Sequence, residues 1–276
     1  MTNEHRYSLF GYRFSFRTNV ARAAELVAEL YAGSEDTSAG SPENHYSLLR
    51  QREQDGASCW RIEVPGTPPS DKRSLGDALS AVEASITADL ARHPHGLHVV
   101  HGGVIYGPRG DLLLSGNSGA GKTTLSLALA ARGLCVGGDD MAVLDPASGS
   151  LRPHPRCFHI DEHSARLLAG LGLRLPEDLM DDQFVTPRRL GLTAPRPARL
   201  RFVFFLEPER LPAPRILSQS QAQAASQLLL QTGRGQFADG EGVRAIAALT
   251  AGARCFQLWS GELAATADAV LRLVEA

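Results

Sequence analysis

A glycine-rich segment in the middle of the chain has the residue types and the spacing needed to bind phosphate. It runs from Gly116 to Thr123 as G-N-S-G-A-G-K-T and matches G-x-x-x-x-G-K-[ST] at every fixed position. An apolar stretch precedes it and a helix-forming stretch follows it, which is the context that this motif requires. Glycines let such a loop fold tightly, so that its N–H groups and the start of the helix point at phosphate oxygens. The segment therefore predicts a nucleotide-phosphate site.

Different side chains of this loop are expected to bind the phosphates and the metal ion. Lys122 is expected to reach the β- and γ-phosphates, and the Thr123 hydroxyl to ligate Mg²⁺. The alternative, a glycine turn with a chance Lys-Thr pair, is disfavoured by the flanking elements. The predicted nucleotide-binding residues are Gly116, Asn117, Ser118, Gly119, Ala120, Gly121, Lys122, Thr123 and Thr124.

Two adjacent carboxylates, Asp139 and Asp140, follow the next apolar stretch. Phosphoryl transfer needs an acidic group to hold the metal and, when the acceptor is a hydroxyl, another to accept its proton. Neighbouring residues of an extended strand point to opposite faces, but at a strand end the chain can turn both toward the phosphates. The alternative is a G-G-D-D turn with solvated acids, and the nearby phosphate loop favours the functional interpretation.

Several segments around the loop resemble, in order and spacing, the catalytic domain of HPr kinase/phosphorylase. The sequence GNSGAGKTTLS is also similar to the phosphate loop of ATP-type phosphoenolpyruvate carboxykinases, to which that kinase domain is structurally related. The resemblance is strong from His98 to Leu144 and loose from there to Ala276. The matching segments are HGGVIY from His101 to Tyr106, the phosphate loop, Ala131-Arg132-Gly133 at the helix end, and Gly138-Asp139-Asp140.

Within this group the chain is most similar to HPr-kinase-related proteins of biosynthetic gene clusters, including kinases of lasso-peptide precursors. Those proteins have a sheet-forming N-terminal region and a P-x-P-R segment after the acidic pair, here Pro153-His154-Pro155-Arg156. True HPr kinases usually have Glu where this chain has Thr124. We also find no match to the glycine-rich segment with which they engage HPr, so a bifunctional HPr enzyme is not expected.

The resemblance implies an ATP- and Mg²⁺-dependent kinase that transfers the γ-phosphate to a hydroxyl of a peptide, a protein side chain or a small molecule. It implies that Asp139 is the general base, that Asp140 joins Thr123 in holding the metal, and that His101 lies near the γ-phosphate. Arg156 is a candidate second cation for the migrating group. HPr-kinase-like domains often assemble, which leaves a homo-oligomer open.

Three other functions stay open at this point. A phosphoenolpyruvate-carboxykinase-like phosphotransferase would need additional Lys and His metal ligands, which we cannot place. A non-catalytic nucleotide-binding module would bind nucleotide without loss of the γ-phosphate. A common P-loop ATPase or GTPase would show a longer apolar strand that ends in a single Asp, and the chain has no N-K-x-D segment to support guanine specificity.

The elements that must position these residues describe an α/β protein, because strand, helix and strand alternate around the loop. With the resemblance, they predict a P-loop core of the HPr-kinase and carboxykinase type, with a mixed sheet, over residues 96–276. The predicted strands are residues 97–105, 112–115, 134–136, 141–144, 198–206 and 255–259, and the predicted helices are 123–132, 218–231 and 263–274.

The first 95 residues differ from the rest of the chain in their residue pattern. They predict a smaller, strand-rich α+β lobe with an accessory or substrate-binding role. Alternating aromatic residues indicate a strand, and alanine-rich or evenly spaced apolar residues indicate helices. Strands are expected at 7–16 and 59–64, helices at 21–30 and 75–92, and a mobile polar loop at 33–44.

Composition limits the partners and the compartment. The 276 residues suffice for about two domains, and 28 basic against 30 acidic residues give a formal charge of −2, which argues against a nucleic-acid partner. The N-terminus lacks a secretory pattern and no stretch approaches the roughly 18 apolar residues of a membrane span, so we expect a cytoplasmic protein with no membrane partner. Four distant cysteines without a C-x-x-C pair are expected to be reduced.

Three weaker signals have ordinary alternatives. His93, His95, His98 and His101 cluster, but the last two face opposite sides of a predicted strand, so zinc is not expected. One or two guanidinium groups are expected in the site. Residues 233–242 predict either a lid or a plain surface loop. The arginines considered are Arg152, Arg156, Arg188, Arg189, Arg196, Arg199 and Arg201, and Phe202, Phe204 and Phe205 are expected in the core.

Overall fold

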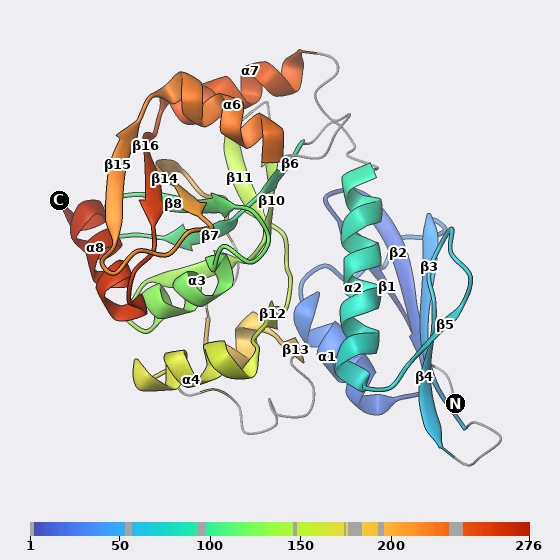
Figure 1. The fold of residues 1–276 in the computed structure, drawn as a ribbon. Coiled ribbons are helices and arrows are strands. Elements are labelled where there is room, and N and C mark those ends of the chain that lie inside the picture. Colours follow the sequence, from blue (N-terminus) through green and yellow to red (C-terminus); the bar gives the residue numbers. More distant parts are fainter. Residues whose placement is uncertain are drawn as a thin grey trace.

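A computed structural model describes most of the chain and shows a mixed α/β protein with several sheets (Figure 1). The described residues are 3–52, 57–92, 98–145, 148–173, 175, 184–192, 196–231 and 240–276. The predicted domain boundary at residues 95 and 96 lies outside them. We call β1 to β5 with helices α1 and α2 the N-terminal lobe, and all later elements the C-terminal lobe.

The N-terminal lobe is a five-stranded sheet with two helices packed on it. The strand order is β1-β2-β3-β4-β5, and only β2 and β3 pair in parallel. The aromatic stretch predicted as one strand is a hairpin, and β3 was not predicted. Helices α1 and α2 lie on the side of the sheet that faces the C-terminal lobe (Figure 1). The elements are β1 (Asn3–Leu9), β2 (Tyr12–Thr18), α1 (Ala21–Leu30), β3 (Asn44–Arg52), β4 (Ser58–Glu63), β5 (Ser70–Lys72) and α2 (Leu75–Arg92).

A six-stranded mixed sheet forms the centre of the C-terminal lobe. Its order is β15-β16-β14-β8-β7-β9, with β8 parallel to β14 and β14 parallel to β16. The strands β8 and β14 are buried along almost their whole length, which explains their uninterrupted apolar sequences. The strands are β7 (Gly103–Tyr106), β8 (Asp111–Gly116), β9 (Cys135–Gly138), β14 (Leu200–Glu207), β15 (Arg215–Gln219) and β16 (Arg254–Trp259).

A smaller sheet packs beside it with the order β11-β10-β6. The prediction of one strand over 97–105 is therefore wrong in one respect, because this stretch divides between two sheets at Gly102. A Cβ at Gly102 would lie 2.7 Å from Leu113 Cδ1 and 2.8 Å from the Leu114 carbonyl oxygen, so only glycine lets the chain turn here. The strands are β6 (His98–His101), β10 (Met141–Asp145) and β11 (Ser150–Pro153), and a separate pair is β12 (Phe158–His159) and β13 (Phe184–Val185).

Helices cover both faces of the large sheet. Residues of α3 and α8 share one apolar cluster, and residues of α6 and α7 belong to a cluster on the other face. The predicted helix over 218–231 begins later, because residues 215–219 form β15, and α7 was not predicted. The helices are α3 (Lys122–Ala130), α4 (Glu162–Gly170), α6 (Gln221–Gln231), α7 (Glu241–Ala251), α8 (Leu263–Glu275) and the 3₁₀ helix η1 (Pro187–Leu190).

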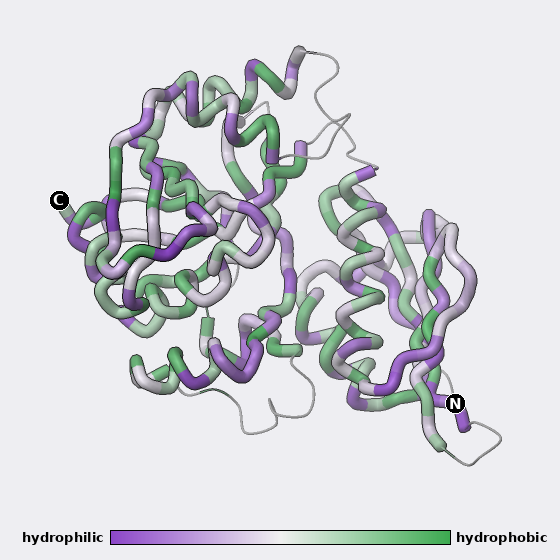
Figure 2. Tube along the Cα trace, in the orientation of Figure 1, coloured by the Kyte–Doolittle hydropathy of each residue, from purple (hydrophilic) through white to green (hydrophobic). Residues whose placement is uncertain are grey.

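The two lobes share buried surface. Met141, Cys157 and Phe184 of the C-terminal lobe belong to the same apolar cluster as the inner faces of α1 and α2. In Figure 2, α2 alternates between hydrophobic and hydrophilic colours along its length, as expected for a helix with one buried face. The N-terminal lobe is thus packed against the segments that follow the acidic pair.

Other expectations from the sequence can be checked directly. The four cysteines are free thiols, three of them buried and Cys135 half-buried. Phe202, Phe204 and Phe205 lie in the core on β14. Within the described residues, no helix is long and apolar enough to cross a membrane.

Candidate functional site

The predicted phosphate loop connects β8 to the start of α3. Gly119 and Gly121 have φ angles of +81° and +92°, which residues with a Cβ rarely adopt. The first backbone bond of the helix runs from the Leu125 N–H to the Gly121 carbonyl, so the amides before Leu125 have no partner within the helix. These features provide the open helix N-terminus that anions favour.

Lys122 is folded back over its own loop. Its side chain is buried, and Nζ donates to the carbonyl oxygens of Gly116 at 2.9 Å and Asn117 at 3.2 Å. Nζ also lies 3.6 Å from Asp140 Oδ1. The ammonium group is therefore held at the mouth of the loop by backbone and a carboxylate together.

Asp139 is a buried carboxylate beside the loop. The Thr123 hydroxyl donates to Asp139 Oδ2 at 2.5 Å, whereas Oδ1 has no hydrogen-bond partner among the described residues. Burial raises the pKa of Asp139 to about 6, and the hydrogen bond from Thr123 and the positive charges of Arg156 and Lys122 only partly oppose this. The resemblance implied that Thr123 works with Asp140, but in this structure it contacts Asp139.

A tight turn brings the two carboxylates to one side. Asp140 has a φ of +65°, a conformation that Asp adopts more readily than most residues. Its carbonyl accepts from the Gly102 N–H at 3.0 Å, and the Met141 N–H donates to the Asp139 carbonyl at 2.8 Å. Both carboxylates consequently line the same cavity as the loop.

Three nitrogen-bearing side chains converge on Asp140. Arg156 Nη1 lies 2.5 Å from Oδ2, and His101 Nε2 and Lys122 Nζ lie 3.3 Å and 3.6 Å from Oδ1. Burial lowers the pKa of His101, and the charges of Lys122 and Arg156 act in the same direction against Asp140, so the ring is neutral at pH 7. Lys122 and Arg156 thus place two positive charges around one half-exposed carboxylate.

Arg156 is fixed from behind by Glu83 of α2, a residue that the sequence analysis missed. Glu83 is 2% exposed; its Oε1 lies 3.8 Å from Arg156 Nε and accepts from the Cys157 N–H at 2.6 Å. Its Oε2 lies 3.4 Å from His159 Nε2. The sequence does contain a signal, because Glu83 lies four residues after Leu79 and three before Ile86 on the apolar side of a predicted helix.

The loop and the carboxylates enclose a cavity of about 340 Å³, which we call the loop cavity. Ser118, Gly119, Gly121, Lys122, Thr123 and Thr124 line it, together with Asp139, Asp140, Arg156 and residues at the start of α4. Three predicted binding residues are not among those that line it. Gly116 and Asn117 present their carbonyls to Lys122, and Ala120 is buried.

A side cavity of about 160 Å³ adjoins the loop cavity at Asp140 and Arg156. His101, Thr87 and Gln231 contribute to its lining, so its walls come from both lobes. The two cavities therefore share one carboxylate and one guanidinium, and together they extend from the loop to α2.

The donor atoms at the site suit Mg²⁺ brought in by a nucleotide. The Thr123 hydroxyl and the two carboxylates offer hard oxygen atoms, which Mg²⁺ prefers, and it usually takes only one or two protein carboxylates plus substrate phosphates. The described residues contain no group of three or more His, Cys, Asp or Glu side chains able to hold a metal by themselves. Of the clustered histidines, His93 and His95 lie outside the described residues.

Most of the predicted arginines lie elsewhere. Of the seven considered, only Arg156 lines the loop cavity, and Arg210, which was not considered, also lines it. Arg152, Arg188 and Arg196 line a different cavity. Most of the segment 233–242, for which a lid or a plain loop was predicted, lies outside the described residues.

No family model matches the chain, and no curated protein matches it. Among solved structures, the chain is similar to the HPr(Ser) kinase/phosphatase from Coxiella burnetii, with 14% sequence identity over 64% of this chain and 91% of that chain. The TM-score is 0.30, so the two share a loose structural similarity.

Proposed function

We propose that this protein is an ATP-dependent phosphotransferase that moves the γ-phosphate to a hydroxyl acceptor. The observation that supports this best is the buried Asp139 carboxylate, hydrogen-bonded to Thr123 of the phosphate loop and lining the loop cavity with Lys122 and Arg156. A simple nucleotide-binding surface would not require a buried acid of raised pKa at this position.

The loop binds the phosphates in this proposal. The unbonded N–H groups at the start of α3 and the Lys122 ammonium neutralise the β- and γ-phosphates. Phosphate oxygens would take the place of the carbonyls and of Asp140 as partners of Lys122. Thr123 and Asp140 would hold Mg²⁺, which supplies charge neutralisation on the phosphates when it is bound.

Asp139 acts as the general base. Its pKa of about 6 leaves it ionised at neutral pH and more basic than an ordinary aspartate. The acceptor O–H bond breaks and its proton passes to Asp139, while the hydroxyl oxygen attacks the γ-phosphorus. The bond from that phosphorus to the bridging oxygen breaks, and ADP leaves with the negative charge.

Arg156 and His101 support the migrating group. The Arg156 guanidinium, held by Glu83, faces the point where the two cavities meet and offsets the charge on the equatorial oxygens. The neutral His101 ring is positioned to donate a hydrogen bond there. The side cavity would admit the body of the acceptor, a peptide, a protein side chain or a small alcohol, and its hydroxyl would reach Asp139 in the loop cavity.

The proposal is tested by incubating the protein with Mg²⁺-ATP and a panel of serine-containing peptides and small alcohols. Mass spectrometry should detect the gain of one phosphate on at least one acceptor, and Lys122→Ala should give none. Retention of the γ-phosphate across the panel by a protein that binds ATP would instead indicate a non-catalytic nucleotide-binding module.

A further inference from the structure

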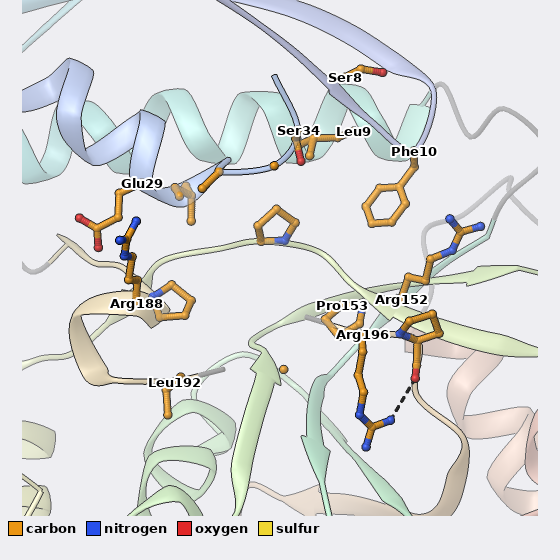
Figure 3. Close-up of a pocket in the computed structure, with 17 residues that line it drawn as sticks. Ser8, Leu9, Phe10, Glu29, Ser34, Arg152, Pro153, Arg188, Leu192 and Arg196 are labelled. Atoms are coloured by element: carbon orange, nitrogen blue, oxygen red, sulfur yellow. Dashed lines mark hydrogen bonds between the residues drawn. The ribbon is translucent and has the colours of Figure 1, made fainter. Parts of the chain in front are cut away.

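A larger cavity, which we call the interlobe cleft, lies between the two lobes and has a volume of about 590 Å³ (Figure 3). Its N-terminal wall comes from the tip of the β1–β2 hairpin, the end of α1 and residues 32–34. Its C-terminal wall comes from Gly137, residues 152, 153 and 155, η1 and residues 192, 196 and 197. Among the described residues, none that lines the cleft also lines the loop cavity. It is therefore a separate place for a ligand.

The cleft is mainly apolar and is built from stiff residues. Four of its lining residues are prolines, which have no N–H group to present to a ligand. Apolar side chains of both lobes complete the walls. A cavity of this volume with mostly apolar walls is typical of sites for small organic molecules. The prolines are Pro153, Pro155, Pro187 and Pro197.

Phe10 is held in the cleft in an unfavourable backbone conformation. It precedes Gly11 at the hairpin tip with a φ of +52°, where a bulky side chain is rare. Figure 3 shows its ring projecting from the tip into the cavity. The Arg152 guanidinium lies 5.8 Å from the ring centroid. Phe10 and Gly11 form the two-residue loop of the hairpin, a turn that requires a positive φ at both residues, so the turn fixes where the ring projects.

Three arginines and one glutamate line the cleft. Arg152 lies 3.4 Å from Asp145, and Arg196 lies 2.9 Å from Asp111. Glu29 already interacts with Arg189 Nε at 3.4 Å and with the Thr186 hydroxyl. The Arg188 side chain, by contrast, is exposed and makes no hydrogen bond or ion pair with the part of the chain that the structure describes. Arg188 and Arg152 lie toward opposite ends of the cavity in Figure 3. The Arg188 guanidinium is thus available to pair with an anion at the edge of the apolar cleft.

We propose that the interlobe cleft binds a small amphipathic organic anion. Its apolar body, of one or two rings or a short acyl chain, packs against Phe10 and the prolines, and its carboxylate, sulfonate or phosphate pairs with Arg188. Along residues 153–156, Pro153 and Pro155 line the cleft, whereas His154 contacts Thr87 at 3.2 Å and Arg156 lines the loop cavity. The ligand would lie directly behind the segment that carries Arg156. This inference does not depend on the proposed function.

The test uses anilinonaphthalene sulfonate, a two-ring aromatic anion, titrated by fluorescence into the full-length protein with excess Mg²⁺-ATP present. We expect saturable binding that Mg²⁺-ATP does not displace. Arg188→Glu and Phe10→Gly should each weaken it about tenfold, the usual effect of losing one charged or aromatic contact. Arg166→Ala, which removes an exposed arginine of α4 outside the cleft, should leave the affinity within about twofold.

Thermal unfolding of each variant establishes that it is folded before the titration. Phe10→Gly removes the ring while glycine accepts the turn conformation, and Arg188 is exposed, so both variants are expected to fold. Unchanged dye affinity in folded Arg188→Glu and Phe10→Gly would overturn the proposal. Displacement of the dye by Mg²⁺-ATP would overturn it as well, because the dye would then be in the loop cavity.

Discussion

The loop cavity and the interlobe cleft lie on opposite sides of residues 153–156, yet they are built by different means. The loop cavity is polar, and several of its charges already contact one another, as in the contacts of Asp140 with Lys122 and Arg156. The interlobe cleft is larger and mostly apolar, and the Arg188 side chain in it has no hydrogen-bond or ion-pair partner in the described chain. The first arrangement suits exchange of one set of charges for another, as phosphate transfer requires, and the second suits retention of an apolar ligand.

The two cavities also differ in which group carries an unfavourable free energy in the folded protein. In the loop cavity it is a buried carboxylate whose ionisation is opposed by burial. In the cleft it is the backbone of Phe10 at a positive φ. Both are local costs that the surrounding packing imposes, and the experiments below ask whether each serves the use that we assign to it.

The largest expected effect separates the two cavities by nucleotide binding. Lys122→Ala removes the charge that pairs with the β- and γ-phosphates, so the affinity for Mg²⁺-ATP should fall by at least about 100-fold in calorimetric titration. Dye binding in the interlobe cleft should not change. Equal nucleotide affinity in the variant and the wild type would show that the loop does not bind phosphate.

The next effect is on transfer rather than binding. Arg156→Ala should slow phosphate transfer about 100-fold, because a guanidinium on the migrating group acts mainly in the transition state. Nucleotide affinity should fall less than tenfold. Arg156→Lys keeps the charge without the planar fork, so its rate should lie between the two. Equal losses of affinity and rate would instead place Arg156 among the ground-state phosphate contacts.

A third experiment measures how far the buried Asp139 carboxylate lowers the free energy of unfolding. Its pKa rises from 3.8 to about 6 on folding, so between these values the native state binds more protons than the unfolded state and stability falls as pH rises. Roughly two pKa units correspond to about 3 kcal/mol. Asp139→Asn should therefore raise the free energy of unfolding at pH 7 by up to about 3 kcal/mol, with the gain vanishing near pH 4.

Urea denaturation between pH 4 and pH 8 measures this difference. Its control is Asp161→Asn, since Asp161 is an exposed N-cap whose pKa is lowered by hydrogen bonds from Ser164, so its loss should have the opposite sign at neutral pH. Parallel stability curves for wild type and Asp139→Asn would contradict the raised pKa.

A smaller effect is expected from the contact between the lobes. Glu83→Gln keeps an acceptor for the Cys157 N–H but removes the charge beside Arg156. Transfer should slow about tenfold with nucleotide affinity within about twofold. The matched control is Glu162→Gln on the exposed start of α4. A loss of stability in Glu83→Gln with an unchanged rate would make Glu83 a purely structural residue.

Most of the residues that the sequence assigned to one site lie together around the loop cavity, because they are close together in the chain. The phosphate loop is one segment, and Asp139 and Asp140 follow it within one strand–helix–strand unit, so a motif and its spacing describe them. Glu83 was not predicted as a site residue because its partner Cys157 is 74 residues away and in the other lobe. The interlobe cleft draws on several separate segments, and no local pattern marks such a site.

The errors in the fold have similar causes. The stretch 97–105 has no turn-forming Asn, Asp or Pro to divide it, and the crowding at Gly102 shows that it serves two sheets. The strands β3 and β15 each have several exposed residues, which weakens the alternation that predicts a strand. Buried elements such as β8 and β14, whose composition is set by the core, were predicted nearly to their observed ends.

The most direct test of the central claim follows phosphate transfer and nucleotide binding on the same preparations of wild type and Asp139→Asn. With an acceptor found by mass spectrometry, we predict that Asp139→Asn binds Mg²⁺-ATP within about twofold of wild type but transfers phosphate at least about 100-fold more slowly. Transfer by Asp139→Asn at the wild-type rate would contradict the assignment of this buried carboxylate as the base.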